Sequence, residues 1–285
     1  MFGKMLYDKR TLYTILIAVI VVPYLFPFKL PLAESKEVKA LFDYVDKDVA
    51  ASRKPIIVAM DFDPSTQGEC KPMAEVLIRH CFIREIPVIV TTFLPSGIGM
   101  AKQIVEDVAK EMGKENYRDF VFLGFKPMYN QVILNMGIDF KKAYPTDAAG
   151  RDIGLIPAMS GVKNIDDIGL IVSISGTTLP EMWIYFAYQR YQAPVGVGTT
   201  AVSATTYFPY FQAGQIKGFM PGISGAGSYE QMLARLAIEK NVQLKQGDAT
   251  ASTSSQAVAH IVIILFIVIG NINYFVAKSR RSKAV

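Results

Sequence analysis

The apolar residues of this chain form two long uncharged stretches near its ends and several shorter runs between them. Residues 11–28 and 257–277 contain no Asp, Glu, Lys or Arg. Each stretch is about long enough to cross a hydrocarbon core of roughly 30 Å as a helix that rises about 1.5 Å per residue. We therefore predict two transmembrane helices with a folded domain between them.

Between these stretches, β-branched apolar runs alternate with segments of helical periodicity. Strands are predicted at 55–62, 87–93, 119–125, 168–175 and 194–200, and helices at 71–84, 97–112, 128–137, 180–191 and near 228–240. Strands that are apolar along their whole length, each followed by a helix, are typical of a parallel sheet covered on both faces. Right-handed crossovers then predict an α/β, doubly wound, Rossmann-like or flavodoxin-like sandwich.

Prolines and glycines support several of the predicted helix boundaries. Pro72 and Pro180 suit the first turn of a helix, where a backbone N–H is not needed. Gly113 and Gly137 suit the position just after a helix, where a left-handed backbone is common. The predicted organisation is an N-tail 1–10, a transmembrane helix 11–28, a connecting amphipathic helix or linker 29–54, the α/β domain 55–244, a polar linker 245–256, a transmembrane helix 257–277 and a basic tail 278–285.

Basic residues outside the apolar stretches predict the orientation of the chain. Lys4, Lys9 and Arg10 precede the first stretch, and four basic residues lie in 278–285. Short cytoplasmic flanks of membrane helices are rich in Lys and Arg, so both termini are expected in the cytoplasm. We predict a two-pass protein of a prokaryotic cytoplasmic membrane, with residues 29–256 outside the cytoplasm and the lipid bilayer as a partner. Two alternatives stay open, a cleaved signal peptide for the first stretch and a buried core helix for the second.

The net charge of +5 belongs to the chain ends. Residues 1–10 carry +2 and residues 278–285 carry +4, and subtracting these six charges leaves −1 for the rest of the chain. Because the domain lacks a basic stripe, we expect no nucleic-acid binding. Cys70 and Cys81 are separated by a predicted helical segment of roughly 16 Å, which is too long for a disulfide.

Two long segments, 138–166 and 201–227, do not follow the alternation of strands and helices. Loops of this length in a compact domain are usually functional or ordered by a partner. The second segment is aromatic and rich in glycine, and three interpretations stay open: core, subunit interface or contact with the membrane surface. The candidate interface residues are Tyr207, Phe208, Tyr210, Phe211, Phe219 and Met220, with Trp183 from the preceding aromatic helix.

Ligands of doubly wound folds bind beyond the carboxyl ends of the strands. The polar residues predicted there are Asp61, Asp63, Thr91, Thr92, Lys126, Ser175, Gly176, Thr177, Thr178, Thr199 and Thr200. Asp61 and Asp63 are two residues apart, so both carboxylates are predicted to point to one side and to suit Mg²⁺ or Ca²⁺. Alternatively, one of them caps the loop while the other caps a helix. No other cofactor is expected.

Motifs of nucleophilic catalysis do not occur at the predicted strand ends. There is no G-x-S-x-G, and His80 is expected on the first helix of the domain, away from the polar strand ends. The leading hypothesis is a non-enzymatic, membrane-anchored subunit that assembles with itself or with membrane partners. One alternative is a ligand-binding or sensing module that uses the strand ends. Another is a divalent-metal hydrolase that uses Asp61 and Asp63.

Overall fold

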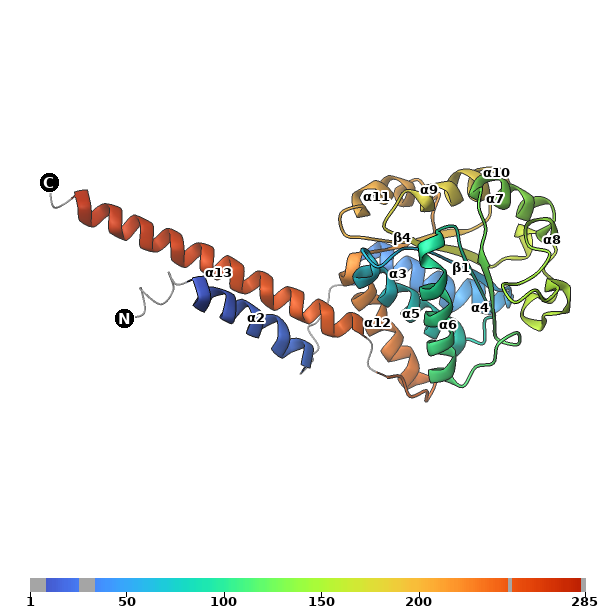
Figure 1. The fold of residues 1–285 in the computed structure, drawn as a ribbon, viewed down its shortest axis with the longest axis horizontal. Coiled ribbons are helices and arrows are strands. Elements are labelled where there is room, and N and C mark those ends of the chain that lie inside the picture. Colours follow the sequence, from blue (N-terminus) through green and yellow to red (C-terminus); the bar gives the residue numbers. More distant parts are fainter. Residues whose placement is uncertain (1–8, 26–33, 246–247, 283–285) are drawn as a thin grey trace. The chain divides into compact units, whose positions relative to one another are not determined.

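The computed structural model describes residues 9–25, 34–245 and 248–282, which belong to two separate units. The larger unit comprises Leu32–Ala249. The smaller unit comprises Met1–Pro31 and Thr250–Val285. Figure 1 shows the sheet of the larger unit with helices on both of its faces.

Six parallel strands form one sheet in the order β3-β2-β1-β4-β5-β6. The strands are β1 (Ile56–Asp61), β2 (Val88–Thr92), β3 (Phe120–Phe125), β4 (Leu170–Ser175), β5 (Val195–Thr199) and β6 (Phe219–Pro221). This order reverses between β1 and β4, as it does in Rossmann-type sheets. The predicted α/β doubly wound fold is therefore confirmed.

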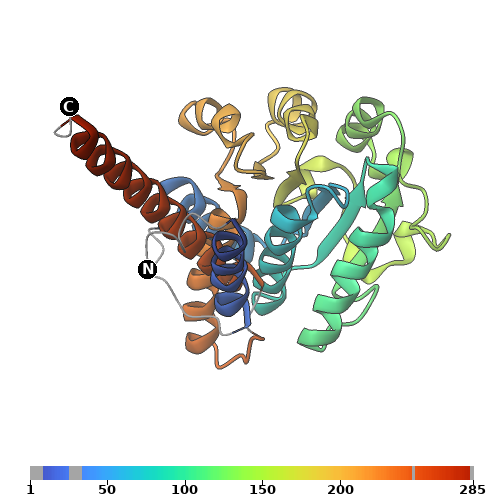
Figure 2. The same ribbon diagram turned by 60° about the vertical axis from the view of Figure 1, so that its left-hand side comes forward.

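Two hydrophobic cores lie on the two faces of the sheet. Each face is covered by its own layer of helices (Figure 2). The first core is covered by α3 (Lys36–Asp43), η1 (Tyr44–Val49), α4 (Ala50–Ser52), α5 (Gln67–Ile83), α6 (Ile98–Met112) and α12 (Gly222–Glu239). The second core is covered by α7 (Tyr129–Ile138), α8 (Phe140–Ala143), α9 (Leu179–Trp183), η6 (Ile184–Tyr188), α10 (Gln189–Tyr191) and α11 (Ala204–Gln212). Side chains alternate between the two faces along each strand, so Met60 joins the first core and Ala59 the second.

A sixth strand corrects the prediction for residues 201–227. This segment forms α11 and β6, and α12 begins at Gly222, six residues before the predicted helix near 228. β6 has only three residues and ends in Pro221, so it is too short to show a periodic pattern. Gly222 has a φ of 58°, a left-handed conformation that glycine adopts without strain.

Two predicted helix boundaries are wrong and two are confirmed, among them Pro180 in the first turn of α9. Because α5 begins at Gln67, Pro72 lies inside the helix and not in its first turn. Gly137 lies inside α7, where a Cβ atom would come 2.1 Å from the Tyr191 ring, so close packing explains this glycine. Gly113 does end α6, with a φ of 65°.

Three connecting segments differ in how they match the predictions. Within the segment 29–54, the expected amphipathic helix is present from Lys36 onward as α3, η1 and α4, which are part of the larger unit. The polar linker expected at 245–256 is wrong from Asp248 onward, where α13 (Asp248–Ser282) begins. The segment 138–166 holds α8 and short helical turns η3 (Ile153–Leu155), η4 (Pro157–Met159) and η5 (Ile165–Asp167), and it supplies core residues to the second face.

The smaller unit consists of α2 (Lys9–Leu25) and part of α13. Among the described residues, one helix is long and apolar enough to cross a membrane, at Ala249–Val276 of α13. α2 has 17 residues within the described range, so the structure supports one candidate membrane-spanning helix, and the first predicted span stays a prediction. Residues 26–28 of the predicted first span and the predicted tail residues 1–8 and 283–285 lie outside the described residues.

Candidate functional site

Three polar residues lie side by side at the carboxyl edge of the sheet, where the strand order reverses. Asp61 ends β1 and pairs with Ser175 of β4, which pairs in turn with Thr199 of β5. Each of the three is fully buried. Their side chains point to the face of the second core, because Ala59 and Ile171 of the same strands belong to that core. The fold therefore brings together three residues that are far apart in the sequence.

Asp61 is a buried carboxyl group with one satisfied oxygen. Its Oδ1 accepts hydrogen bonds from the backbone N–H of Phe93 at 2.6 Å and from the Thr92 hydroxyl at 3.4 Å. Its Oδ2 has no partner among the described residues. Burial raises the pKa of Asp61 to about 7, although the two hydrogen bonds act in the opposite direction. This carboxyl group therefore changes its charge near neutral pH.

The loop after β4 is held by hydroxyl groups at its start. Ser175 donates to the backbone carbonyl of Asp61 at 2.7 Å, and its Oγ accepts from the backbone N–H of Thr177 at 3.0 Å. The Thr177 hydroxyl lies 2.9 Å from the same Oγ, and Thr178 precedes α9 without a side-chain cap. Gly176 packs against Thr66, since a Cβ atom there would lie 2.5 Å from Thr66 Cγ2. The loop is thus closely packed against the start of α5.

Tyr144 lies at the carboxyl edge of the sheet beside the ends of β2 and β3, and the sequence analysis did not identify it. Its hydroxyl lies 2.5 Å from Oγ1 of Thr91, which donates to the Gly124 carbonyl at 3.1 Å. Lys126 Nζ lies 5.5 Å from the centre of the Tyr144 ring. Burial raises the pKa of Tyr144, and the nearby Asp61 carboxylate raises it further. No sequence signal points to Tyr144, because it comes from the segment 138–166 outside the strand–helix repeat.

Four buried polar atoms on this side of the sheet have no hydrogen-bond partner among the described residues. They are Oδ2 of Asp61, Oγ of Ser173, Oγ1 of Thr199 and Nε1 of Trp183. Trp183 stacks on Phe93 with ring centres 5.4 Å apart, and the backbone of Phe93 binds Asp61. Buried polar groups usually find partners, so the unpaired atoms of Asp61 and Thr199 leave the row at the strand ends able to form further hydrogen bonds.

Asp63 has different partners from Asp61. It is partly exposed, and its Oδ1 accepts from the backbone N–H and the hydroxyl of Ser65 at 2.9 and 2.5 Å. These hydrogen bonds from Ser65 lower the pKa of Asp63. Asp63 therefore caps its own loop, and no cluster of three or more His, Cys, Asp or Glu that suits a metal occurs among the described residues. The Mg²⁺ or Ca²⁺ site at the two aspartates stays a prediction.

Most of the remaining candidate ligand-binding and interface residues are buried within the larger unit. Thr200 is buried and donates to Ser203 at 3.3 Å. The buried members of the predicted interface set are Tyr207, Phe219, Met220 and Trp183, while Tyr210 and Phe211 are half-buried and Phe208 is exposed. Phe208 and Phe211 pack on Phe219 with ring centres 5.0 and 6.1 Å away. This packing matches the core interpretation of the segment.

Apolar side chains are exposed in the segments that follow several strands, two of them on loops and one at the start of α6. Ile98, Met128 and Val202 come shortly after β2, β3 and β5, and Val202 is 88% exposed. Met128 has a φ of 59°, an unusual backbone conformation for a residue other than glycine. These side chains lie at the carboxyl edge because all six strands are parallel. The edge thus combines a polar interior with apolar residues on its loops.

The edge can bind by hydrogen bonds, but within the described residues it holds no pairing of a nucleophile with a histidine. His80 lies on α5 as predicted and bonds Tyr229 and Asp46 instead. Both cysteines are free and buried, which confirms the predicted absence of a disulfide between them.

No protein-family model, curated protein or solved structure matches the chain.

Proposed function

We propose that this protein is a membrane-anchored, non-enzymatic module that binds a small polar ligand at the carboxyl ends of β1, β4 and β5. The observation that carries the proposal is the row Asp61, Ser175 and Thr199, with Oδ2 of Asp61 unpaired in a buried position. The point of strand reversal is where doubly wound folds bind ligands. The apolar helix at Ala249–Val276 supplies the membrane anchor.

The chemistry of the unpaired atoms selects the class of ligand. Asp61 accepts a hydrogen bond when ionised and donates one when protonated, and Thr199 does both. Trp183 Nε1 only donates. A ligand with several hydroxyl or amide groups can both donate and accept hydrogen bonds, so it matches these three unpaired groups. The residues from the end of β1 to the start of α5 (61–68, DFDPSTQG) lack the G-x-G-x-x-G sequence, so a dinucleotide pyrophosphate is not the proposed ligand.

Access to Asp61 requires a movement of the loops around it, because the carboxyl group is fully buried. Three loops meet there, at residues 62–66 after β1, 93–97 after β2 and 176–178 after β4. Gly97 is close to the first of them, since a Cβ atom there would lie 2.8 Å from the Phe62 carbonyl oxygen. A ligand that separates these loops would change the position of α5, which begins directly after the first loop.

The binding experiment compares two aspartates. Purified full-length protein in detergent is screened by thermal shift and calorimetry against sugars, amino acids, nucleotides, Mg²⁺, Mn²⁺ and Ca²⁺. A ligand that shifts the wild type should lose its effect with Asp61→Asn and keep it with the matched control Asp63→Asn. If no compound in the panel shifts the wild type, or if both variants respond alike, the proposal fails. Divalent-ion binding that Asp61→Asn removes would instead favour the metal-hydrolase alternative.

The proposed topology is two-pass, with both termini in the cytoplasm of a prokaryote and the larger unit outside. The basic residues at both chain ends support it. Both native cysteines are buried, so a single new cysteine can report the side of the membrane. In intact cells, an impermeant maleimide should label Leu155→Cys, at a 75% exposed position, but not Ala284→Cys in the C-terminal tail. The opposite labelling would place the larger unit in the cytoplasm.

A second candidate function is assembly with further copies or with membrane partners. Two exposed apolar side chains at the carboxyl edge, Met128 and Val202, support it, and a partner would cover them. Light scattering of detergent-solubilised protein should show a particle larger than a monomer. A double Met128→Asp, Val202→Asp variant should reduce its size, whereas Leu155→Asp, at another exposed site, should not. A strictly monomeric wild type would exclude self-assembly.

A further inference from the structure

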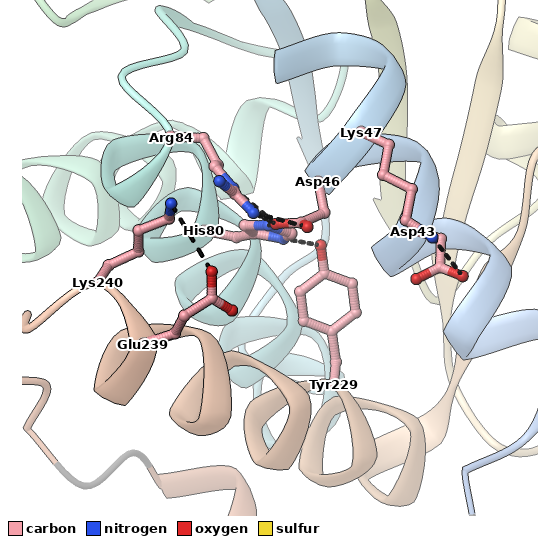
Figure 3. Close-up of polar contacts among 8 residues, drawn as sticks. All are labelled: Asp43, Asp46, Lys47, His80, Arg84, Tyr229, Glu239 and Lys240. Atoms are coloured by element: carbon pink, nitrogen blue, oxygen red, sulfur yellow. Dashed lines mark hydrogen bonds and ion pairs between the residues drawn. The ribbon is translucent and has the colours of Figure 1, made fainter. Parts of the chain in front are cut away.

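A second group of buried polar side chains joins three of the helices that cover the first core. Figure 3 shows His80 of α5 between Asp46 of η1 and Tyr229 of α12. Nδ1 of His80 lies 2.7 Å from the Tyr229 hydroxyl, and Nε2 lies 3.0 Å from Oδ1 of Asp46. The imidazole ring also stacks on Phe42 of α3 at 4.4 Å. His80 and Tyr229 have no exposed surface, so the proposed ligand site on the other face of the sheet does not use them.

The partners of His80 determine where its proton lies. Arg84 donates to both oxygens of Asp46, through Nε and Nη2, each at 2.7 Å. Although burial alone would raise it, the hydrogen bonds from His80 and Arg84 lower the pKa of Asp46 to about 2. An ionised carboxylate only accepts hydrogen bonds, so Nε2 of His80 must carry the hydrogen. Nδ1 of the neutral ring then accepts a hydrogen bond from the Tyr229 hydroxyl. In this arrangement, each hydrogen bond of the cluster joins one donor to one acceptor.

A second proton on His80 would disturb this arrangement. Nδ1 would become a donor that faces the Tyr229 hydroxyl, and within the described residues that hydroxyl has no recorded hydrogen bond except the one with Nδ1. The added charge would be buried beside Arg84, whose charge Asp46 already balances. Burial lowers the pKa of His80, and the attraction of Asp46 opposes this without reversing it.

The charged residues around the cluster do not favour a second proton on His80. Figure 3 places Asp43 and Lys47 on one side and Glu239 and Lys240 on the other. Asp43 lies 2.6 Å from Lys39 and 3.6 Å from Lys47, so this group carries one net positive charge. Glu239 and Lys240 form a neutral pair at 3.8 Å. Asp46 is therefore the carboxylate that attracts a proton to His80, whereas Arg84 and the Lys39–Asp43–Lys47 group oppose it.

The cluster also has a particular place in the chain. η1 continues α3, the first helix after α2 in the sequence, and α12 is the last helix before α13. The two segments nearest in sequence to the apolar helices are thus bonded to the same imidazole. We propose that Asp46, His80 and Tyr229 form a pH-sensitive clamp that holds η1 and α12 on α5 and releases them when His80 takes a second proton. This proposal does not depend on the ligand site.

Nitrogen NMR of the histidine rings tests the clamp directly in the full-length protein in detergent. The chain has two histidines, so His260→Gln leaves His80 as the only signal. At pH 7.5 the ring should be neutral with its hydrogen on Nε2. Between pH 7.5 and 5.0, it should begin to titrate only below the pKa of a free histidine, about 6.5. Relative to α6 as an internal control, hydrogen exchange of residues 44–49 and 222–239 should rise by up to about tenfold per pH unit as the pH falls from about 6.5 to the lower pKa of His80, and stay level below it.

His80→Gln is the matched control for the clamp. A glutamine amide can donate to Asp46 and accept from Tyr229, but it does not titrate, so the pH dependence of exchange should disappear while the packing stays. Equal pH dependence in wild type and His80→Gln would overturn the proposal, and so would a neutral ring with its hydrogen on Nδ1. If His80→Gln does not fold, Tyr229→Phe gives a second measurement. Without the hydroxyl, His80 should take its proton at a higher pH than in wild type, and an unchanged titration would contradict the clamp.

Discussion

Replacing Asp61 with asparagine should remove a large pH-dependent contribution to the stability of the larger unit. The carboxyl group is fully buried, and Oδ1 accepts from Phe93 whether or not the group is ionised. Asparagine keeps that acceptor and is always neutral, so it resembles the protonated form of Asp61. The substitution therefore tests the charge of Asp61 with little change in its shape.

The size of the effect follows from the pKa of Asp61. Burial raises it from 3.8 to about 7, so between these values the folded state keeps a proton that the unfolded state loses. Stability must therefore fall as the pH rises from about 4 to about 7 and stay level above it. Three pKa units correspond to about 4 kcal/mol at 1.36 kcal/mol per unit. Asp61→Asn has no such loss, so it should be about 4 kcal/mol more stable than wild type at pH 8 and similar to it at pH 4.

Trp183 provides the assay. It is the only tryptophan of the chain, it is fully buried, and it stacks on Phe93 beside the mutated residue. Urea unfolding of the full-length protein in detergent can be followed by its fluorescence from pH 4 to pH 8 for wild type, Asp61→Asn and Asp63→Asn. The last variant controls for the loss of a carboxylate that is partly exposed and bonds Ser65.

The difference between the unfolding free energies of Asp61→Asn and wild type should grow with pH. A difference that stays constant to within about 1 kcal/mol from pH 4 to pH 8 would refute the argument, because it would mean that Asp61 has nearly the same pKa in the folded and unfolded states. A difference that grows in the opposite direction would show that the ionised carboxylate is stabilised by a partner. Either result would also weaken the proposed ligand site.

Three further predictions concern packing and thiol reactivity. Gly137→Ala should destabilise the unit by about 1–3 kcal/mol in thermal or urea unfolding, because its Cβ would overlap the Tyr191 ring, whereas Gly99→Ala, with nothing within 4 Å, should be nearly neutral. Phe219→Ala should cost about 3–5 kcal/mol, since this ring is fully buried beneath α11, and a smaller loss would mean that the segment does not belong to the core. Burial raises the pKa of Cys70 to about 12, so a thiol reagent at pH 8 should label it only after denaturation, and rapid labelling of the folded protein would contradict the structure.

The fold class follows from the sequence wherever the apolar runs are long. Strands such as 55–62 and 168–175 are apolar throughout, and the structure places β1 and β4 within them. β6 could not be predicted, since its three residues are defined only by pairing with β5. The first residue of α5 was also missed, because the predicted helix began at residue 71, whereas α5 begins at Gln67 and buries Cys70 in the first core.

The candidate site was predictable only in part. Position at the end of an apolar strand identified Asp61, Ser175 and Thr199, because parallel strands end at one edge. Their partners were not predictable. Phe93 reaches Asp61 from 32 residues away in the sequence, and Tyr144 reaches Thr91 from a segment that follows no repeat.

The sequence by itself determined the alternation of strands and helices and the apolar helix near the C-terminus, because both depend on periodicity and length within one segment. Only the tertiary structure decided that Asp61 and Asp63 have separate partners, that Phe219 lies in the core, and that His80 joins η1 to α12. Each of these depends on contacts between distant segments. A hydrogen bond or a buried contact between distant segments forms only when the fold brings the two residues together. The local pattern of residues around either one does not identify its partner.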